Sequence, residues 1–193
     1  MPEPPGNPAK TDGARERILA AARDELAERG FEASSVRTIA QSAGVTAAMI
    51  NYYFGSKRAL YDGVVAEAQG RLHARLAAAL ADGPSASRLA AAYFDFLVEE
   101  RQMQRLLLRE VLDAGGGRLS ELVRPLHGLL TEHFGDEAAV QSALSVFGAI
   151  AGYFIYAPVL GELVGADPLS PDALARRREH IIHLVSTIEE SNR

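Results

Sequence analysis

The basic residues that could bind phosphate lie in a stretch without carboxylates. Residues 34–60 contain Arg37, Lys57 and Arg58 but no Asp or Glu. Ammonium and guanidinium groups bind phosphate oxygens, and a guanidinium can also bind the acceptor edge of guanine. The chain as a whole has a formal net charge of −5, but attraction to a polyanion depends on the local patch of charge. These residues are therefore candidates for binding a nucleic acid, although so short a stretch can also lack carboxylates by chance.

Patterns for catalysis and metal binding are weaker. The sequence has no nucleophile elbow, no zinc-protease helix motif, no P-loop and no dinucleotide-binding glycine fingerprint. It has no cysteine, which excludes disulfides and thiolate ligands. His180 and His183 are three residues apart and could share a metal ion, but two half-buried histidines at a helix contact are the simpler interpretation. We expect no catalytic residue, no metal site and no cofactor.

Cap and turn residues predict two short helices around the basic residues. Ser35 can cap a helix over residues 36–43, and Gly44 can end that helix in a left-handed conformation. Thr46 can cap a second helix over residues 47–54. Two helices joined in this way form a helix-turn-helix motif, whose second helix lies in the DNA major groove.

The helical period divides the second of these helices into a buried side and an exposed side. The residues expected to pack inward are Val45, Met49, Ile50 and Phe54. The residues expected to face the groove are Thr46, Ala47, Ala48, Asn51 and Tyr52.

Apolar residues recur at helical spacing along the rest of the chain, and no segment shows a convincing strand pattern. Thr11 or Asp12 can cap a first helix that ends near Gly30, and the proline-rich residues 1–12 are expected to be a disordered lead. Further helices are expected over residues 57–81, 85–100, 101–114, 118–134, 136–157 and 172–190. The predicted fold class is all-α.

Residues 143–164 form the most apolar stretch and are long enough to cross a membrane. Gly148, Gly152, Pro158, Gly161 and Glu162 interrupt the stretch, and no neighbouring segment supplies a basic flank. We therefore expect a buried interface helix and no membrane contact. The N-terminal residues contain no apolar run typical of a signal peptide, and together with the absence of cysteine this favours a cytoplasmic location.

A second candidate site lies among apolar residues of the C-terminal part. Pro125 should disturb the helix over residues 118–134, which can leave a cavity between helices. The same side chains could instead fill the core of a helical bundle, and for most of them that is the simpler interpretation. The candidate ligand-binding residues are Tyr93, Phe94, Leu97, Met103, Leu107, His127, Phe147 and Phe154.

Three segments together resemble the TetR/AcrR family of helix-turn-helix regulators. They are GARERILAAARDELAERGFEASS, SSVRTIAQ and AGVTAAMINYYFGSKRALY, which cover residues 13–61. The resemblance implies DNA contacts from Ser34, Ser35, Arg37, Thr46, Ala47, Ala48, Asn51, Tyr52, Tyr53 and Lys57. Asn51 stands where most members carry a tyrosine that touches the DNA backbone, and an asparagine can bond a phosphate or read adenine.

The resemblance also implies two parts with different functions. A helix-turn-helix DNA-binding domain would occupy residues 13–58, and a ligand-binding and dimerisation domain would occupy residues 59–193. The last two long helices of each subunit would form the dimer seam, for which the candidate residues are Gly148, Gly152, Ile181 and Leu184.

The expected function is a homodimeric repressor that a small, apolar molecule releases from a palindromic double-stranded DNA operator. Two alternatives stay open. One is a transcriptional activator of the same fold, since whether such a protein represses or activates depends on where the operator lies. The other is an all-helical carrier or enzyme for an apolar metabolite, which would have no reason to keep residues 34–57 basic and aromatic.

Overall fold

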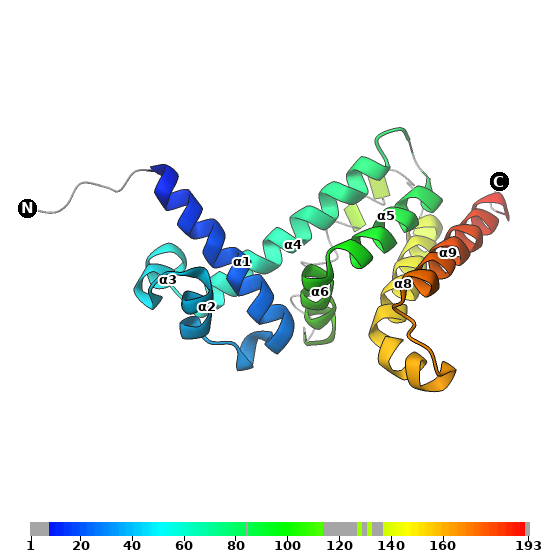
Figure 1. Cartoon of the computed structure of the whole chain (residues 1–193). Coiled ribbons are helices and arrows are strands. Elements are labelled where there is room, and N and C mark those ends of the chain that lie inside the picture. The colour runs from blue at the N-terminus through cyan, green and yellow to red at the C-terminus, as the bar shows by residue number, and fades with distance from the viewer. Residues whose placement is uncertain (1–7, 84, 114–126, 129–130, 133–136, 192–193) are drawn as a thin grey trace, which may run out of the picture.

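The computed structural model describes residues 8–83, 85–113, 127–128, 131–132 and 137–191. The fold is all-α, as predicted, and the described residues contain no strand (Figure 1). The helices, in chain order, are α1 (Pro8–Ala33), α2 (Val36–Ala43), α3 (Ala47–Phe54), α4 (Lys57–Ala79), α5 (Ala86–Glu99), α6 (Arg101–Asp113), α8 (Glu137–Val164) and α9 (Pro171–Ser191).

The first helix begins earlier than its cap residues suggested. The structure places residues 8–12 in α1, whereas the sequence predicted a disordered lead up to residue 12. Pro8 suits the first turn of a helix, because its fixed φ is already helical and its missing N–H would have no partner there. Residues 1–7 lie outside the described part of the chain.

Helices α1 to α4 enclose a small core at the N-terminal end of the molecule. Ile18, Ile39, Ile50 and Leu60 are almost completely buried in it. At Gly30 the backbone leaves helical geometry (φ 76°, ψ 177°), which a glycine does at little cost. Just beyond this break, the ring of Phe31 lies 5.1 Å from the ring of Tyr61 on α4, centroid to centroid.

Helix α4 joins the two ends of the molecule (Figure 1). It packs against α1 and α3 near its start and against α5 and α6 further along. Arg71 and Arg75 of α4 form ion pairs with Glu100 and Glu99 at the end of α5. Helix α6 also packs directly on α1, so the two ends share one continuous core.

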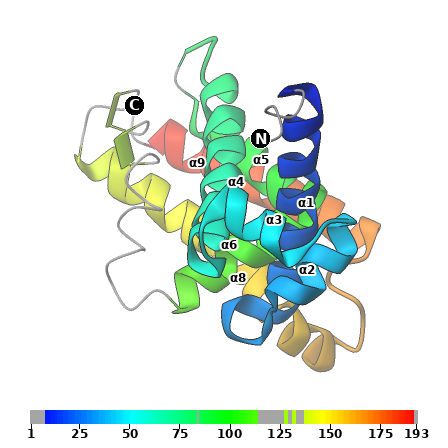
Figure 2. The same cartoon turned by 90° about the vertical axis from the view of Figure 1, so that its left-hand side faces the viewer.

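The C-terminal helices pack around α5. Both α8 and α9 contact it, and Figure 2 shows this group behind α1, α2 and α3. Arg178 of α9 donates two hydrogen bonds, of 2.7 and 2.8 Å, to the carboxylate of Asp95 on α5. These hydrogen bonds raise the pKa of the Arg178 guanidinium. The pair therefore fixes α9 on the inner helix α5.

Helix α8 is longer than predicted. The sequence suggested an end near Ala157, but the helix continues through Pro158 to Val164. A proline removes one helical hydrogen bond without removing those that follow. The helix instead ends at Gly165, which is left-handed (φ 68°) and donates its N–H to the Gly161 carbonyl at 3.0 Å.

The outer side of α8 is unusually apolar. Residues Val140–Val164 have a mean hydropathy of 1.8, so this helix is long and apolar enough to cross a membrane, although 24% of its most apolar window is buried within the chain. Phe147, Ile150 and Phe154 face the core, while Tyr156 and Leu163 are exposed. An exposed apolar side of this kind is typical of an interaction surface, because its burial is favourable.

Candidate nucleic-acid interface and pocket

The helix-turn-helix motif forms with the caps that the sequence indicated. The Ser35 hydroxyl accepts a hydrogen bond from the Thr38 N–H at 3.0 Å, and the Thr46 hydroxyl accepts one from the Met49 N–H at 3.3 Å. Gly44 is left-handed at φ 65° and donates its N–H back to the Gln41 carbonyl. Local hydrogen bonds therefore fix where α2 and α3 begin and where α2 ends.

The two sides of α3 are as predicted. Ile50 is completely buried, and Val45, Met49 and Phe54 are half-buried against the core. The exposed residues are Thr46, Ala47, Ala48, Asn51 and Tyr52. Tyr52 is 82% exposed, which is far more than an apolar ring normally shows on a free surface. Tyr53 is half-buried and meets the Tyr52 ring edge-on at 5.3 Å.

Two of the predicted contact residues near the start of α2, Ser34 and Arg37, lie in different environments. Arg37 is exposed and forms no ion pair with any carboxylate in the part of the chain described, so its guanidinium is available. Ser34 is 4% exposed, and its hydroxyl donates to the Phe31 carbonyl at 2.9 Å. The prediction that Ser34 contacts DNA is therefore wrong, because its hydroxyl closes the turn between α1 and α2.

Lys57 begins α4 beside this surface. Its ammonium donates to the Glu32 carbonyl at 3.4 Å and lies 4.5 Å from the centroid of the Phe31 ring. Ser56 caps the same helix by accepting a hydrogen bond from the Ala59 N–H at 3.1 Å. A lysine and a helix N-terminus are thus held together, and both favour an anion.

The structure adds two basic residues that are not among the predicted contact residues. Arg15 lies 5.4 Å from the centroid of the Phe54 ring, and Arg17 donates to the Ala43 carbonyl at 3.3 Å. Both are exposed and extend from α1 toward the ends of α3 and α2. The only signal in the sequence was their spacing on the polar side of α1, which does not show what that side meets.

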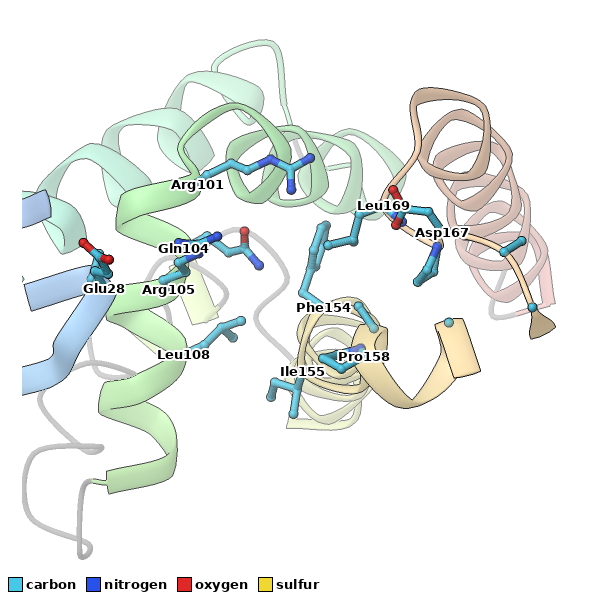
Figure 3. A pocket seen from close by; sticks show the side chains of 16 residues that line it. Glu28, Arg101, Gln104, Arg105, Leu108, Phe154, Ile155, Pro158, Asp167 and Leu169 are labelled. Atoms are coloured by element: carbon cyan, nitrogen blue, oxygen red, sulfur yellow. The ribbon is translucent and has the colours of Figure 1, made fainter. Parts of the chain in front are cut away.

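A pocket lies where the N-terminal and C-terminal helices of the molecule meet. It has a volume of about 930 Å³ and is formed by α1, α6, α8 and the segment that follows α8 (Figure 3). Its walls include apolar side chains of α6 and α8, with Arg101, Gln104 and Arg105 along one side.

The comparisons with known proteins concern first the helix-turn-helix end. Residues 18–64 match the model of bacterial regulatory proteins of the tetR family. This segment runs from the middle of α1 to the first turns of α4 and includes the whole helix-turn-helix motif. The chain carries a TetR-family DNA-binding domain.

Solved structures of other proteins resemble the chain along nearly its whole length. The fatty acid degradation regulator FadR from Bacillus halodurans is 17% identical, with a TM-score of 0.67, and the match covers 88% of this chain and 96% of that one. A transcriptional regulator from Rhodococcus sp. RHA1 is 22% identical, with a TM-score of 0.67 over 89% and 95% of the two chains. A transcriptional regulator from Aquifex aeolicus is 16% identical, with a TM-score of 0.67 over 91% and 99%. The curated proteins compared with the chain give no match. The fold as a whole is that of a TetR-family transcriptional regulator.

Most of the predicted ligand-binding residues of this TetR-like chain are not in the pocket. Of the eight, only Phe154 is among its lining residues. The others except His127 pack into the core, where for instance the Tyr93 and Phe147 rings lie 4.4 Å apart. Burial raises the pKa of Tyr93 to about 12.

Five of these residues are buried in the core and Tyr93 is half-buried against it, which favours the simpler interpretation; the five are Phe94, Leu97, Met103, Leu107 and Phe147. His127 is exposed and is not among the lining residues of this pocket, so its part in ligand binding stays a prediction. That prediction depended on Pro125, which lies outside the described residues.

The candidate dimer residues of the TetR-like chain also differ in their exposure. Gly148 is exposed, Gly152 is half-buried and Leu184 is 42% exposed, so all three can meet a second chain. Ile181 is 1% exposed because it packs into the core that includes α5, and its assignment to the interface is wrong. His180 and His183 are both exposed, and no group of three metal-binding side chains occurs among the residues described.

Proposed function

We propose that the chain is a homodimeric transcriptional repressor that binds a palindromic DNA operator and leaves it when a small molecule binds. The exposed side of α3 carries the proposal. Asn51 and Tyr52 project from a helix that is fixed to the core by Ile50, and they lie in a stretch without carboxylates. Such a rigid, protruding helix suits the major groove.

The neighbouring groups supply contacts to the DNA backbone. Lys57 and the N-terminus of α4 can bind one phosphate together, and Arg37 can reach either a phosphate or a guanine. Ser35 and Thr46 use their hydroxyl groups as caps, so their part in DNA binding comes from exposed backbone and position at the helix starts. Ala47 and Ala48 are small enough to let α3 approach the base edges closely.

Two copies are needed because one short helix reads few base pairs. We place the seam on the exposed sides of α8 and α9, where Gly148, Tyr156, Leu163 and Leu184 are accessible. A symmetric dimer brings two copies of α3 to half-sites about one turn of DNA apart. It also covers the apolar side of α8, which explains that helix without a membrane and is consistent with a cytoplasmic protein.

Contacts between the N-terminal and C-terminal helices can transmit ligand binding to α3 and so release the chain from DNA. Helix α6 packs on α1, and the ion pairs of Arg71 and Arg75 connect α4 to the end of α5. A ligand that binds a conformer with a different spacing of the two α3 helices lowers operator affinity by the coupling free energy, typically ~1–3 kcal/mol.

The test is selection of bound fragments from genomic DNA by the purified full-length chain, followed by titration of the enriched duplex and a scrambled duplex. We expect a two-fold symmetric sequence to be enriched, bound with a strong salt dependence. The variant Tyr52→Ala should lose preference for the enriched duplex while its helical content is unchanged, because Tyr52 is almost fully exposed. Equal affinity of the wild-type chain for both duplexes would refute the proposal.

A further inference from the structure

We infer that the pocket between α1, α6 and α8 binds an amphiphilic carboxylate, and that this ligand is the molecule that releases the chain from DNA. The releasing role rests on the proposed function, whereas the binding site rests on the pocket itself. Arg101, Gln104, Arg105 and Leu108 all line the pocket and are spaced along one side of α6. The pocket therefore has a wall that changes from cationic to apolar along a single helix.

The two arginines have charges that the chain itself does not neutralise. Arg101 and Arg105 are exposed at the pocket and form no ion pair with a carboxylate of the described residues. Figure 3 shows the side chain of Arg101 extending from α6 toward the segment that follows α8. A guanidinium offers paired N–H donors in the geometry of a carboxylate, so two of them on one wall favour such a group over a neutral one.

Gln104 is an independent indication of a polar ligand group. The residue is 7% exposed and lines the pocket, yet its side-chain amide makes no hydrogen bond to another described residue. No atom of this amide is both fully buried and without a partner, so the amide reaches the open space of the pocket. A ligand oxygen placed between Arg101 and Arg105 could accept a hydrogen bond from this amide.

Two carboxylates also line the pocket, and they are at its margins. Asp167 accepts the Leu169 N–H at 2.9 Å, which ties it to the backbone of its own turn. Glu28 belongs to α1 and already has an interaction of its own. In Figure 3 Glu28 and Asp167 lie at opposite margins, with Arg101 between them. The α6 wall itself contributes two guanidinium groups and no carboxylate to the pocket lining.

The remaining wall suits a hydrocarbon chain. Leu108 of α6 faces Phe154, Ile155 and Pro158 of α8 across the pocket (Figure 3). The ring of Pro158 adds apolar surface to this wall of α8. One end of the pocket is therefore cationic and the other apolar, which is the pattern that an amphiphilic anion complements.

The position of the pocket connects its occupancy to DNA binding. Ala27 and Glu28, which line it, belong to α1 of the DNA-binding domain, whereas Phe154 and Pro158 belong to the C-terminal part. A ligand there touches both parts at once. It can therefore bias the packing of α6 on α1 and hence the position of the α2–α3 pair.

Decanoate is the probe, and 1-decanol and decyltrimethylammonium are the matched neutral and cationic probes, all below their micelle-forming concentrations. The chain has no tryptophan, so Ile155→Trp places a single fluorescent reporter in the pocket wall. Leu108→Trp, or calorimetry on the unmodified chain, replaces it if that variant loses helical content. We expect decanoate to bind about tenfold more tightly than 1-decanol, as expected for a charged hydrogen bond, and the cation to bind least.

The paired variant Arg101→Met/Arg105→Met keeps the apolar stems and removes both charges. It should abolish the preference for decanoate while leaving 1-decanol affinity unchanged. Arg29→Met/Arg176→Met removes two exposed arginines that do not line this pocket, so it is the control for the same change of net charge and should behave as the parent. A preference for decanoate that survives in the paired variant, or equal binding of all three probes, overturns the proposed ligand class.

A separate titration of the enriched operator duplex distinguishes this proposal from the proposed function. Decanoate should weaken operator binding by the parent about tenfold and leave the paired variant unaffected. Normal operator binding without arginine-dependent decanoate binding overturns the pocket proposal alone. Arginine-dependent decanoate binding that leaves operator affinity unchanged overturns the releasing role. Failure to prefer any DNA overturns the proposed function, while the fluorescence titration still decides the pocket.

Discussion

The ammonium of Lys57 lies 4.5 Å from the centroid of the Phe31 ring and 3.4 Å from the Glu32 carbonyl oxygen. These contacts join the start of α4 to the end of α1, just beyond the break at Gly30. Lys57 is therefore held in place before any DNA arrives, and it has a structural part as well as a charge. The contribution of Lys57 to stability and its contribution to DNA binding can be measured separately.

Lys57→Ala should weaken binding to every DNA sequence alike and reduce the slope of log affinity against log salt by about one unit, because one phosphate contact is lost. It should also lower the free energy of unfolding by ~0.5–1 kcal/mol through loss of the cation–ring contact. Phe31→Leu is the control, since it removes the ring contact and keeps the charge. The phosphate contact is excluded if Lys57→Ala changes stability but leaves the salt slope as in the wild type.

Arg37→Ala should reduce affinity for the operator by ~1–3 kcal/mol if the guanidinium binds guanine, with little change for a scrambled duplex. Its side chain is exposed and free of ion pairs to described carboxylates, so the folded state should be unaffected. Titration of both duplexes is the measurement, with Arg29→Ala as a charge-matched control on the surface of α1. An equal loss on both duplexes would assign Arg37 to a phosphate.

Asn51→Ala should weaken the operator complex by ~1–3 kcal/mol, because an asparagine in the groove can bond two positions of adenine. Asn51 is exposed on α3 and the buried side of that helix is held by Ile50, so the variant should unfold at the same temperature. We would measure how the wild type and Asn51→Ala bind operators altered at one base pair at a time. The comparison identifies the base pair that Asn51 contacts. Unchanged operator affinity would remove Asn51 from the interface.

Gly148→Leu should weaken the dimer and operator binding together, since a bulky side chain prevents close approach of the two copies of α8. A side chain fits at Gly148 within one chain, because no atom lies within 4 Å of the position its Cβ would take. Gly70→Leu on α4 has the same free space and is the matched control. Sedimentation across a range of concentrations measures the association, and a Gly148→Leu chain that dimerises as the control does would move the seam elsewhere.

Stability should fall at high pH through Tyr93. Burial raises the pKa of Tyr93 to about 12, whereas an unfolded tyrosine titrates near 10. The stabilisation is complete below about pH 10 and is lost as the pH rises toward 12, because the unfolded chain releases this proton first. Urea unfolding at about pH 9 and about pH 11.5 should show an extra loss of about 2 kcal/mol in the wild type relative to Tyr93→Phe. The same pH dependence in both proteins would show that Tyr93 is solvated.

Local physics explains why the DNA-binding end was predictable. The caps at Ser35 and Thr46 and the turn at Gly44 depend on hydrogen bonds and φ angles within a few residues. The buried and exposed sides of α3 follow from the helical period once Ile50 is taken as the core residue. These features are properties of short segments, so the order of residues is enough to determine them.

Only the tertiary structure decided which side chains meet. Ser34 and Ile181 look available in the sequence but are buried, because α1 closes over one and α5 covers the other. Arg101 and Gln104 carried no recognisable motif, and they line a pocket only because α6 lies opposite α8. Contacts between segments so far apart depend on the angles at which whole helices pack, and the apolar pattern of one helix does not contain them.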